Sequence, residues 1–290
     1  MTAQRPTLAQ RGVDGVTMLL LPAILFIVAL FIYPFLYGLI LSFEPKVGGW
    51  LANYQRFFSD PFLYDTIGKT LMLAVPVTLV NVAVSVPVAL RVRLMRNPRL
   101  LTTILVIPIT LGTVLVAEGM LNYFGPRGWL NRFIIEFGLS DSPIRLIHNY
   151  WGVFLSLVIT GFPFTFLLTL SYVTGIDPAL EQAGAMLGAK GWQRFKTIIL
   201  PLLVPGLVIT FCLSFVQAFS VFPSAVLLGA PAGDTRVISI AAYTAAFEEY
   251  DYSMASAIAM IMGAVQMVIV AAMLGLQSLV YRGPAGGGKG

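Results

Sequence analysis

Few residues of this chain could perform catalysis or hold a metal ion. The 290 residues include one histidine, His148, and one cysteine, Cys212. Metal sites and nucleophilic centres need several such side chains to converge on one point. We therefore expect no catalytic residue, no metal site and no internal disulfide in this chain.

A glycine-rich tail, GPAGGGKG at residues 283–290, nearly matches the phosphate-binding loop pattern G-x-x-x-x-G-K-[ST]. In that pattern a serine or threonine follows the lysine, a strand precedes the loop and a helix follows it. Here Gly290 follows Lys289, and an apolar segment precedes the tail. We interpret residues 281–290 as a disordered tail, and we expect this chain to bind no nucleotide or other cofactor.

Polar side chains inside apolar stretches are the other candidates for chemistry. Glu118 has Asn122 one helical turn beyond it, and Asn81 and Gln217 lie in other apolar segments. An ionisable group in a membrane span is a functional candidate, whereas amides more often hydrogen-bond between helices. Phe219 offers an aromatic face that binds an organic cation or simply packs. We hypothesise that these five residues line a substrate pathway; the alternative for Glu118 is a place at the membrane rim or against a neighbouring subunit.

Six apolar segments make up most of the sequence. Hydrophobic residues are 58% and charged residues 11% of the chain, against about 25% charged in soluble domains. Each segment has about the 20 residues that a helix needs to cross a bilayer, and none shows the ten-residue alternation of a membrane barrel. The segments are 15–43, 67–90, 101–124, 151–174, 201–228 and 253–280. We predict an all-α integral membrane protein with a six-helix bundle over residues 15–280, its first segment too long for a signal peptide.

Basic residues mark one side of this predicted bundle. Eleven of the 18 lysines and arginines lie in the tails and in the connections after the second and fourth segments. The other connections hold most of the acidic residues. Lysine and arginine in short loops stay on the cytoplasmic side, so we expect the tail 1–14, the loop 175–200 and the tail 281–290 to be cytoplasmic. The net charge of +5 therefore indicates orientation in a lipid membrane and not nucleic-acid binding.

The loop 175–200 is a polar, helix-prone interruption between two apolar segments. Asp177 and Pro178 are typical of a helix start. Gly188 predicts a bend, and a second short helix should follow over about 191–199. The first helix has an apolar face at positions i, i+3, i+4 and i+7: Leu180, Ala183, Gly184 and Leu187.

This loop resembles the EAA loop of the permease subunits of binding-protein-dependent ABC importers. That loop reads E-A-A, three residues, G, nine residues and I-x-L-P. The same spacing runs here from QAG at 182–184 through Gly188 to IILP at 198–201. Gln182 replaces the glutamate and Gly184 the second alanine, and Glu181 is placed to supply a carboxylate instead. The resemblance marks an ATPase-coupling site of seven residues: Glu181, Gln182, Ala183, Gly184, Gly188, Ala189 and Pro201.

The resemblance implies a type I ABC importer permease in the bacterial inner membrane. Its 175–200 loop would act as a coupling helix on a separate ATPase subunit, which holds the ATP and Mg²⁺. A rigid pair of short helices suits the transmission of a rigid-body shift. The implied partners are two ATPase subunits, a second homologous permease and a soluble substrate-binding protein.

Three further stretches resemble the spermidine/putrescine-type permeases: LANYQRFFSDP (51–61), GWLNRFIIEFGL (128–139) and FPSAVLLGAP (222–231). We therefore expect a polyamine or similar nitrogenous solute as cargo, and a heterodimer of permeases. A phosphonate, ferric iron or a sugar is the alternative, because TAAFEEYDYSMASAIA (244–259) partly resembles sugar-type members. An ion-coupled secondary transporter, from another class, would show inverted repeats and paired charges within its spans.

The charge asymmetry predicts opposite locations for two sites in the chain. Reporter fusions at Gly283 and within 230–235 should report opposite compartments, because an odd number of spans separates the two positions in the predicted bundle. Compartment-specific labelling of the two fusions is the measurement. Equal labelling of both from outside the cell would contradict the predicted topology.

Overall fold

The computed structural model describes residues 19–280. Regular structure in that part of the chain is all helical, and six stretches are long and apolar enough to cross a membrane. They are Leu21–Ser42, Pro61–Arg93, Arg99–Glu136, Tyr150–Thr174, Gly191–Phe219 and Tyr252–Gln277. The predicted all-α membrane fold with six spans is confirmed. The predicted tails, 1–14 and 281–290, lie outside the described residues.

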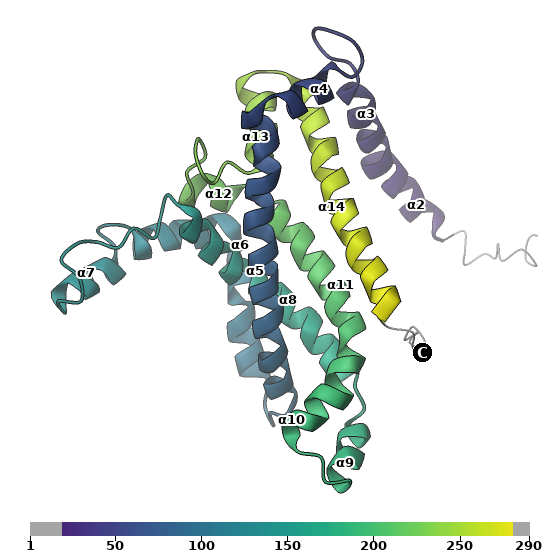
Figure 1. Ribbon diagram of the computed structural model, residues 1–290, viewed down its shortest axis with the longest axis vertical. Coiled ribbons are helices and arrows are strands. Elements are labelled where there is room, and N and C mark those ends of the chain that lie inside the picture. The colour runs from purple at the N-terminus through teal and green to yellow at the C-terminus, as the bar shows by residue number, and fades with distance from the viewer. Residues whose placement is uncertain (1–18, 281–290) are drawn as a thin grey trace, which may run out of the picture.

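Helix α5 (Pro61–Arg93) is the centre of the bundle. Asp60 accepts a hydrogen bond from the Phe62 N–H at 2.9 Å, and Pro61 occupies the first turn, so the helix begins where its sequence favours a start. Helices α8 (Tyr150–Thr174) and α11 (Leu200–Phe219) pack against α5 along its length (Figure 1). These three helices hold most of the buried residues of the spans.

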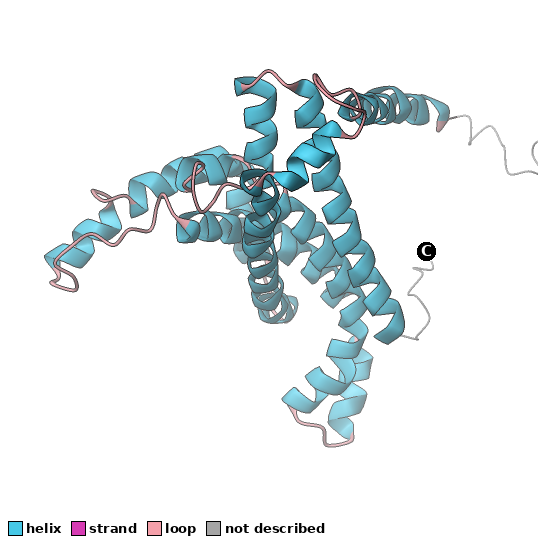
Figure 2. Cartoon of the chain, turned by 45° about the horizontal axis from the view of Figure 1, so that its top comes forward, coloured by secondary structure: helices cyan, strands magenta, loops and turns pink. Residues whose placement is uncertain are grey.

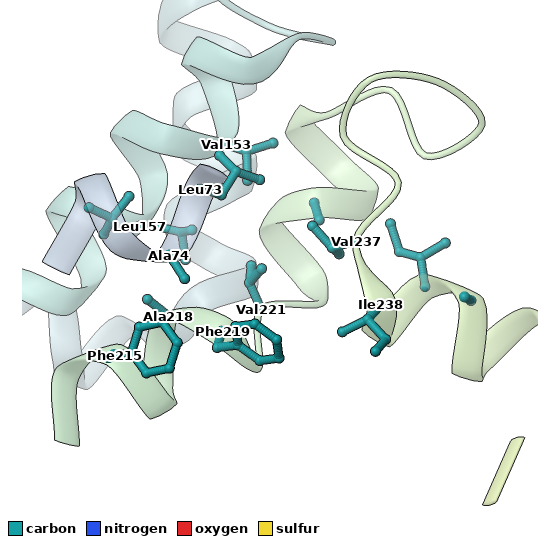
Figure 3. Packing of buried hydrophobic residues seen from close by; sticks show 14 of the residues in the cluster. Leu73, Ala74, Val153, Leu157, Phe215, Ala218, Phe219, Val221, Val237 and Ile238 are labelled. Carbon is teal, nitrogen blue, oxygen red and sulfur yellow. The ribbon is translucent and has the colours of Figure 1, made fainter. Parts of the chain in front are cut away.

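Buried hydroxyl groups join these helices to one another. Pairs with oxygen separations of 2.8–2.9 Å link α5 to α8, α8 to α11, and α8 to the short helix α12 (Pro223–Leu228): Ser85–Thr169, Thr165–Ser214 and Ser156–Ser224. Because lipid offers no water, hydroxyls in membrane helices find partners across helix interfaces. The buried apolar residues form two clusters, and in the larger one α5, α8 and α11 meet the start of α13 (Ile238–Tyr243) (Figure 3).

The first and last spans pack against each other, and the last span also packs on α11 and α13. The first is α2 (Leu21–Ile27), a π-helical turn η2 (Val28–Ile32) and α3 (Tyr33–Ser42), and α3 packs on α14 (Tyr252–Val280). Helix α4 (Ala52–Ser59) joins them, since Asn53 donates to the Ser42 carbonyl at 3.0 Å and to Ser253 Oγ at 2.7 Å. In both views α2 lies away from the central helices (Figures 1 and 2). Its residues are exposed on this chain.

Two spans are broken, and one of the breaks corrects the sequence prediction. The predicted segment 201–228 is α11 followed by α12, because Pro223 lacks the N–H that would continue the helical hydrogen bonding. Helix α6 (Arg99–Phe124) bends at Gly112, whose φ of 75° and ψ of 164° are not helical. Only glycine adopts that conformation readily.

The connection between α12 and α13 is held against the start of α5. The guanidinium carbon of Arg236 lies 3.4 Å from the centre of the Phe62 ring, and the residue is 6% exposed. Burial lowers the pKa of Arg236, and the nearby carboxylates of Asp60, Glu249 and Glu248 raise it. An arginine stays charged under such shifts, so the contact is a cation–π interaction with acidic groups nearby. The turn η4 (Thr244–Glu248) follows α13 at this end.

A buried asparagine links two backbone segments of the connection between α6 and α8. This connection includes α7 (Trp129–Glu136). Asn131 Nδ2 donates to the carbonyls of Gly125 at 2.8 Å and Ile144 at 3.1 Å, and its Oδ1 accepts from the Ile144 N–H at 2.7 Å. The residue is 0% exposed. One side chain thus joins the two ends of a loop that extends from the bundle (Figure 1).

We predict that Asn131→Ala loosens this connection. The change leaves buried backbone groups unpaired, at about 1–3 kcal/mol each, so amide hydrogen exchange across 125–149 should accelerate by tenfold or more. Asn122→Ala is the control, because Asn122 is exposed and donates only to the Glu118 carbonyl of its own helix. Equal exchange rates in the two variants would contradict the role given to Asn131.

Candidate functional site

The loop 175–200 contains two short helical arms. The first is α9 (Pro178–Met186), where Asp177 Oδ1 accepts from the Ala179 N–H at 2.8 Å and Pro178 is the first residue, as the sequence predicts. Gly188 has a φ of 81°, which confirms the predicted bend. Of the four residues of the predicted apolar face, Gly184 is buried, and Leu180, Ala183 and the C-cap residue Leu187 are exposed on this chain.

The second arm joins the loop to the fifth span. It comprises α10 (Gly191–Arg194) and a π-helical turn, η3 (Phe195–Ile199), which runs directly into α11 at Leu200. The Lys190 N–H donates to Gln193 Oε1 at 2.9 Å, which starts the arm. Ile199 is buried in a second apolar cluster with residues of α5 and α8. The predicted second helix over about 191–199 is therefore confirmed, and the two arms extend beyond one end of the bundle (Figure 1).

Gly184 allows the two arms to pack closely. A Cβ atom at this position would lie 2.7 Å from Ile198 Cδ1 and 3.4 Å from Arg194 Cγ, so the side chains of the second arm occupy its place. This contact is a physical reason for glycine where the EAA pattern has alanine. Around it, Gln182, Ala183 and Pro201 are exposed and Ala189 is half-buried.

Glu181 faces the bundle in this structure. Its carboxylate forms an ion pair with Arg93, the last residue of α5. The side chains are 12% exposed for Arg93 and 21% for Glu181. A carboxylate engaged in this way is not free at the loop surface, whereas the amide of Gln182 is exposed.

A partly open cavity, here called the polar cavity for its seven polar lining residues, lies between α5, α6, α8, α11 and α12, and apolar residues complete its lining. Its volume is about 220 Å³, close to that of seven water molecules in the liquid. It lies where α11 stops before α12 and next to the bend at Gly112, so two broken spans border it. Its polar lining residues are Asn81, Thr113, Thr160, Ser214, Gln217, Ser220 and Ser224.

Asn81 carries an unpaired polar atom in the cavity wall. The residue is 2% exposed, and its Oδ1 is buried without a hydrogen-bond partner. Gly161 of α8 is close, because a Cβ there would lie 2.8 Å from Asn81 Nδ2. A buried unpaired acceptor costs about 1–3 kcal/mol. Asn81 lies about 20 residues from the start of α5, near the middle of the span.

The structure brings together two of the five candidate pathway residues. Asn81 and Gln217 both line the cavity. Phe219 is 0% exposed, packs in the apolar core and is not among the cavity residues (Figure 3). Glu118 and Asn122 are exposed on α6 and are not among the cavity residues.

The hydroxyl residues of the cavity were missed by sequence reasoning. Threonine and serine are common in membrane helices, and most of them bond to a carbonyl of their own helix, as Thr160 does with the Ser156 carbonyl at 2.8 Å. Their types alone therefore do not separate cavity residues from packing residues. Within the described residues, no group of three histidine, cysteine or acidic side chains is placed to hold a metal ion.

Comparisons with known proteins agree with this geometry. The probable sulfate transport system permease protein cysT of Prototheca wickerhamii is 32% identical over 165 residues, which are 57% of this chain and 62% of the relative. The spermidine/putrescine transport system permease protein PotB of Haemophilus influenzae is 29% identical over 182 residues, 62% of this chain and 63% of the relative. The matched part is thus less than two thirds of the length of these relatives.

A solved structure shares the fold. It is the bacterial alginate ABC transporter in complex with alginate pentasaccharide-bound periplasmic protein, and its similar chain has a TM-score of 0.80 and 23% identity. The likeness covers 92% of this chain and 95% of that chain. The family described as binding-protein-dependent transport system inner membrane component matches residues 77–283, which include the loop 175–200 and every residue of the polar cavity. This chain belongs to that family of ABC transporter permeases.

Proposed function

We propose that this chain is the permease subunit of an ATP-driven, binding-protein-dependent importer and forms part of its translocation pathway. The observation that carries the proposal is the pair of helical arms, α9 and α10–η3, beyond one end of the bundle (Figure 1). A short exposed helix can lie in a groove of a partner protein. In this proposal the arms contact a separate ATPase subunit, which hydrolyses ATP with Mg²⁺, and the permease itself catalyses no reaction.

The proposal includes a definite setting for the chain. The loop 175–200 and both tails face the cytoplasm, and the chain lies in the bacterial inner membrane with a second, homologous permease beside it. The apolar surface of the first span supports this setting, because none of its most apolar window is buried in this chain. Such a surface needs lipid or another subunit against it. Two ATPase subunits and a soluble substrate-binding protein complete the importer.

The cargo we propose is a polyamine or a similar small nitrogenous solute. The similarity to PotB supports it, and so does the amide of Asn81 in the cavity wall, a group of the type that accepts a hydrogen bond from an ammonium or amine. The last turn of α11 also borders the cavity, and the C-terminal end of a helix favours a cation. Sulfate is the second candidate, because the cysT relative is similarly identical and the cavity lining includes no carboxylate.

The test of this function is reconstitution of the chain with its ATPase, permease and receptor partners in lipid vesicles. ATP-dependent uptake of radiolabelled putrescine is the result expected. ATP-dependent uptake of sulfate but not of putrescine would show that sulfate is the cargo. ATP-independent uptake that follows an ion gradient would contradict the importer class itself.

We predict that Gly188→Glu separates the permease from its ATPase. Gly188 lies at the bend with open space around it, so a partner that contacts the bend would bury the new carboxylate, at several kcal/mol unless it is paired. Co-purification of the ATPase subunit should fall tenfold or more, with normal membrane insertion. Gly138→Glu is a matched control: its φ of 66° is also positive and its surroundings are also open, but it lies beyond α7. Full ATPase binding by the Gly188 variant would show that the bend is not part of the interface with the ATPase.

We predict that Asn81→Leu reduces uptake while it stabilises the chain. Leucine is larger than asparagine but branches at the same atom, and it removes the unpaired buried acceptor, so the melting temperature should hold or rise. Uptake should fall tenfold or more, because the cavity loses its free amide. Thr78→Val is the control, since the Thr78 hydroxyl is buried on the same helix and donates to the Ala74 carbonyl at 2.7 Å. Unchanged uptake by Asn81→Leu would exclude Asn81 from the pathway.

A further inference from the structure

One guanidinium group connects three elements at the loop end of the bundle. Arg93 is the last residue of α5. Its Nη2 is paired with the Glu181 carboxylate on α9, and its Nη1 donates to the Val173 carbonyl at 3.1 Å, in the last turn of α8. That carbonyl is at the negative end of the α8 dipole, which favours a cation. The arginine therefore contacts α5, α8 and α9 at once.

The ion pair is partly shielded from water. Beneath it, the second apolar cluster packs Val92 of α5 against Val173 and Ile176 at the end of α8 and against Ile199 of η3. The Arg194 side chain of α10 also reaches Glu181, with Nη1 at 3.5 Å from its backbone carbonyl. Two planar donors on one arginine fix the geometry of such a contact more tightly than a point charge would.

Helix α9 follows α8 directly in the sequence and is joined to α11 through the second arm. Helices α9 and α5 are not neighbours in the sequence. Helix α9 packs on α10 and η3, and the Arg93–Glu181 pair ties it to α5. Yet α5 carries Asn81, which lines the polar cavity 12 residues before Arg93. At 1.5 Å per residue this is about 18 Å along the helix. A displacement of α9 can therefore reach the cavity wall on α5 through this ion pair, beside the packing of η3 on α5 in the second apolar cluster.

We propose that Arg93 is a positioning residue for transport coupling, because it makes α9 and α5 move together. A displacement of the loop 175–200 then shifts the part of the cavity wall that contains Asn81. The inference rests on the proposed function, since it requires an ATPase that displaces the loop. It gives Glu181 an internal role, as the attachment point of α9 to α5. The exposed residues of the loop remain available for the partner.

The experiment is a double-mutant cycle in the reconstituted importer, with putrescine and sulfate as the probes. The quantity measured is the number of solute molecules imported per ATP hydrolysed, in assembled complexes. Arg93→Gln and Glu181→Gln should each lower this ratio tenfold or more, and the double variant should lower it no further, because both changes break one contact. Arg93→Lys should retain part of the ratio, since lysine keeps the charge but cannot hold both acceptors.

The matched control is Arg96→Gln, which removes a charge from an exposed arginine three residues beyond Arg93. The ratio should not change in that variant. A double variant whose loss is the product of the two single losses would overturn the proposal, because the residues would then act separately. An unchanged ratio in Glu181→Gln would overturn it as well.

Failure of the inference and failure of the proposed function give different results. If only the inference is wrong, Gly188→Glu still abolishes ATPase binding while Arg93→Gln leaves the transport ratio unchanged. If the proposed function is wrong, the unmodified chain shows no ATP-dependent uptake with these partners and Gly188→Glu has no effect. Should Arg93→Gln fail to assemble, Glu181→Gln and Arg93→Lys carry the same test.

Discussion

Polar groups within lipid must find their partners inside the protein, and this constraint organises the central bundle. Serine and threonine hydroxyls pair across α5, α8, α11 and α12 at 2.8–2.9 Å, or bond to carbonyls of their own helices. The apolar core fills the spaces between them. Against this background an unpaired buried polar atom is an exception that requires an explanation. Asn81 Oδ1 and Thr210 Oγ1 are such atoms, and of these two residues Asn81 belongs to the wall of the polar cavity.

The breaks in the spans follow from the same constraint. A helix that stops in lipid leaves carbonyl and N–H groups without partners, so irregular backbone in a membrane lines a cavity or is buried in protein. The gap between α11 and α12 and the bend at Gly112 both border the polar cavity. Pro223 and the positive φ of Gly112 produce these breaks locally. Because both breaks border the same cavity, they are consistent with a transport pathway at that point.

At the loop end, small contacts make the two arms a rigid unit. Gly184 admits Ile198 and Arg194 at close distance, and Arg93 joins the unit to α5 and α8. The exposed tip at Met186 and Leu187 makes little contact with this chain, since the two residues are 89% and 90% exposed. An apolar tip on a rigid base is suited to a partner surface, whereas the internal ion pair is suited to transmitting the movement of that tip.

Much of this protein could be predicted from local sequence alone. Six apolar segments of bilayer length determine six spans, because a helix is the way for a single segment to satisfy its backbone in lipid. Asp177, Pro178 and Gly188 determine the start of α9 and the bend after it, since capping and positive φ depend on the residue itself. The position of α10–η3 followed from the same local signals.

Which polar residues meet was decided only by the tertiary structure. The spans are apolar around most of their circumference, so periodicity does not show which face of a helix points inward. Asn81 and Gln217 therefore meet at the cavity, whereas Glu118 lies on an exposed face of α6, although all three are polar residues in apolar segments. Arg93 and Glu181 are 88 residues apart in the sequence. Their pairing depends on the rotation of α5 and the path of the loop, which packing fixes and local sequence does not.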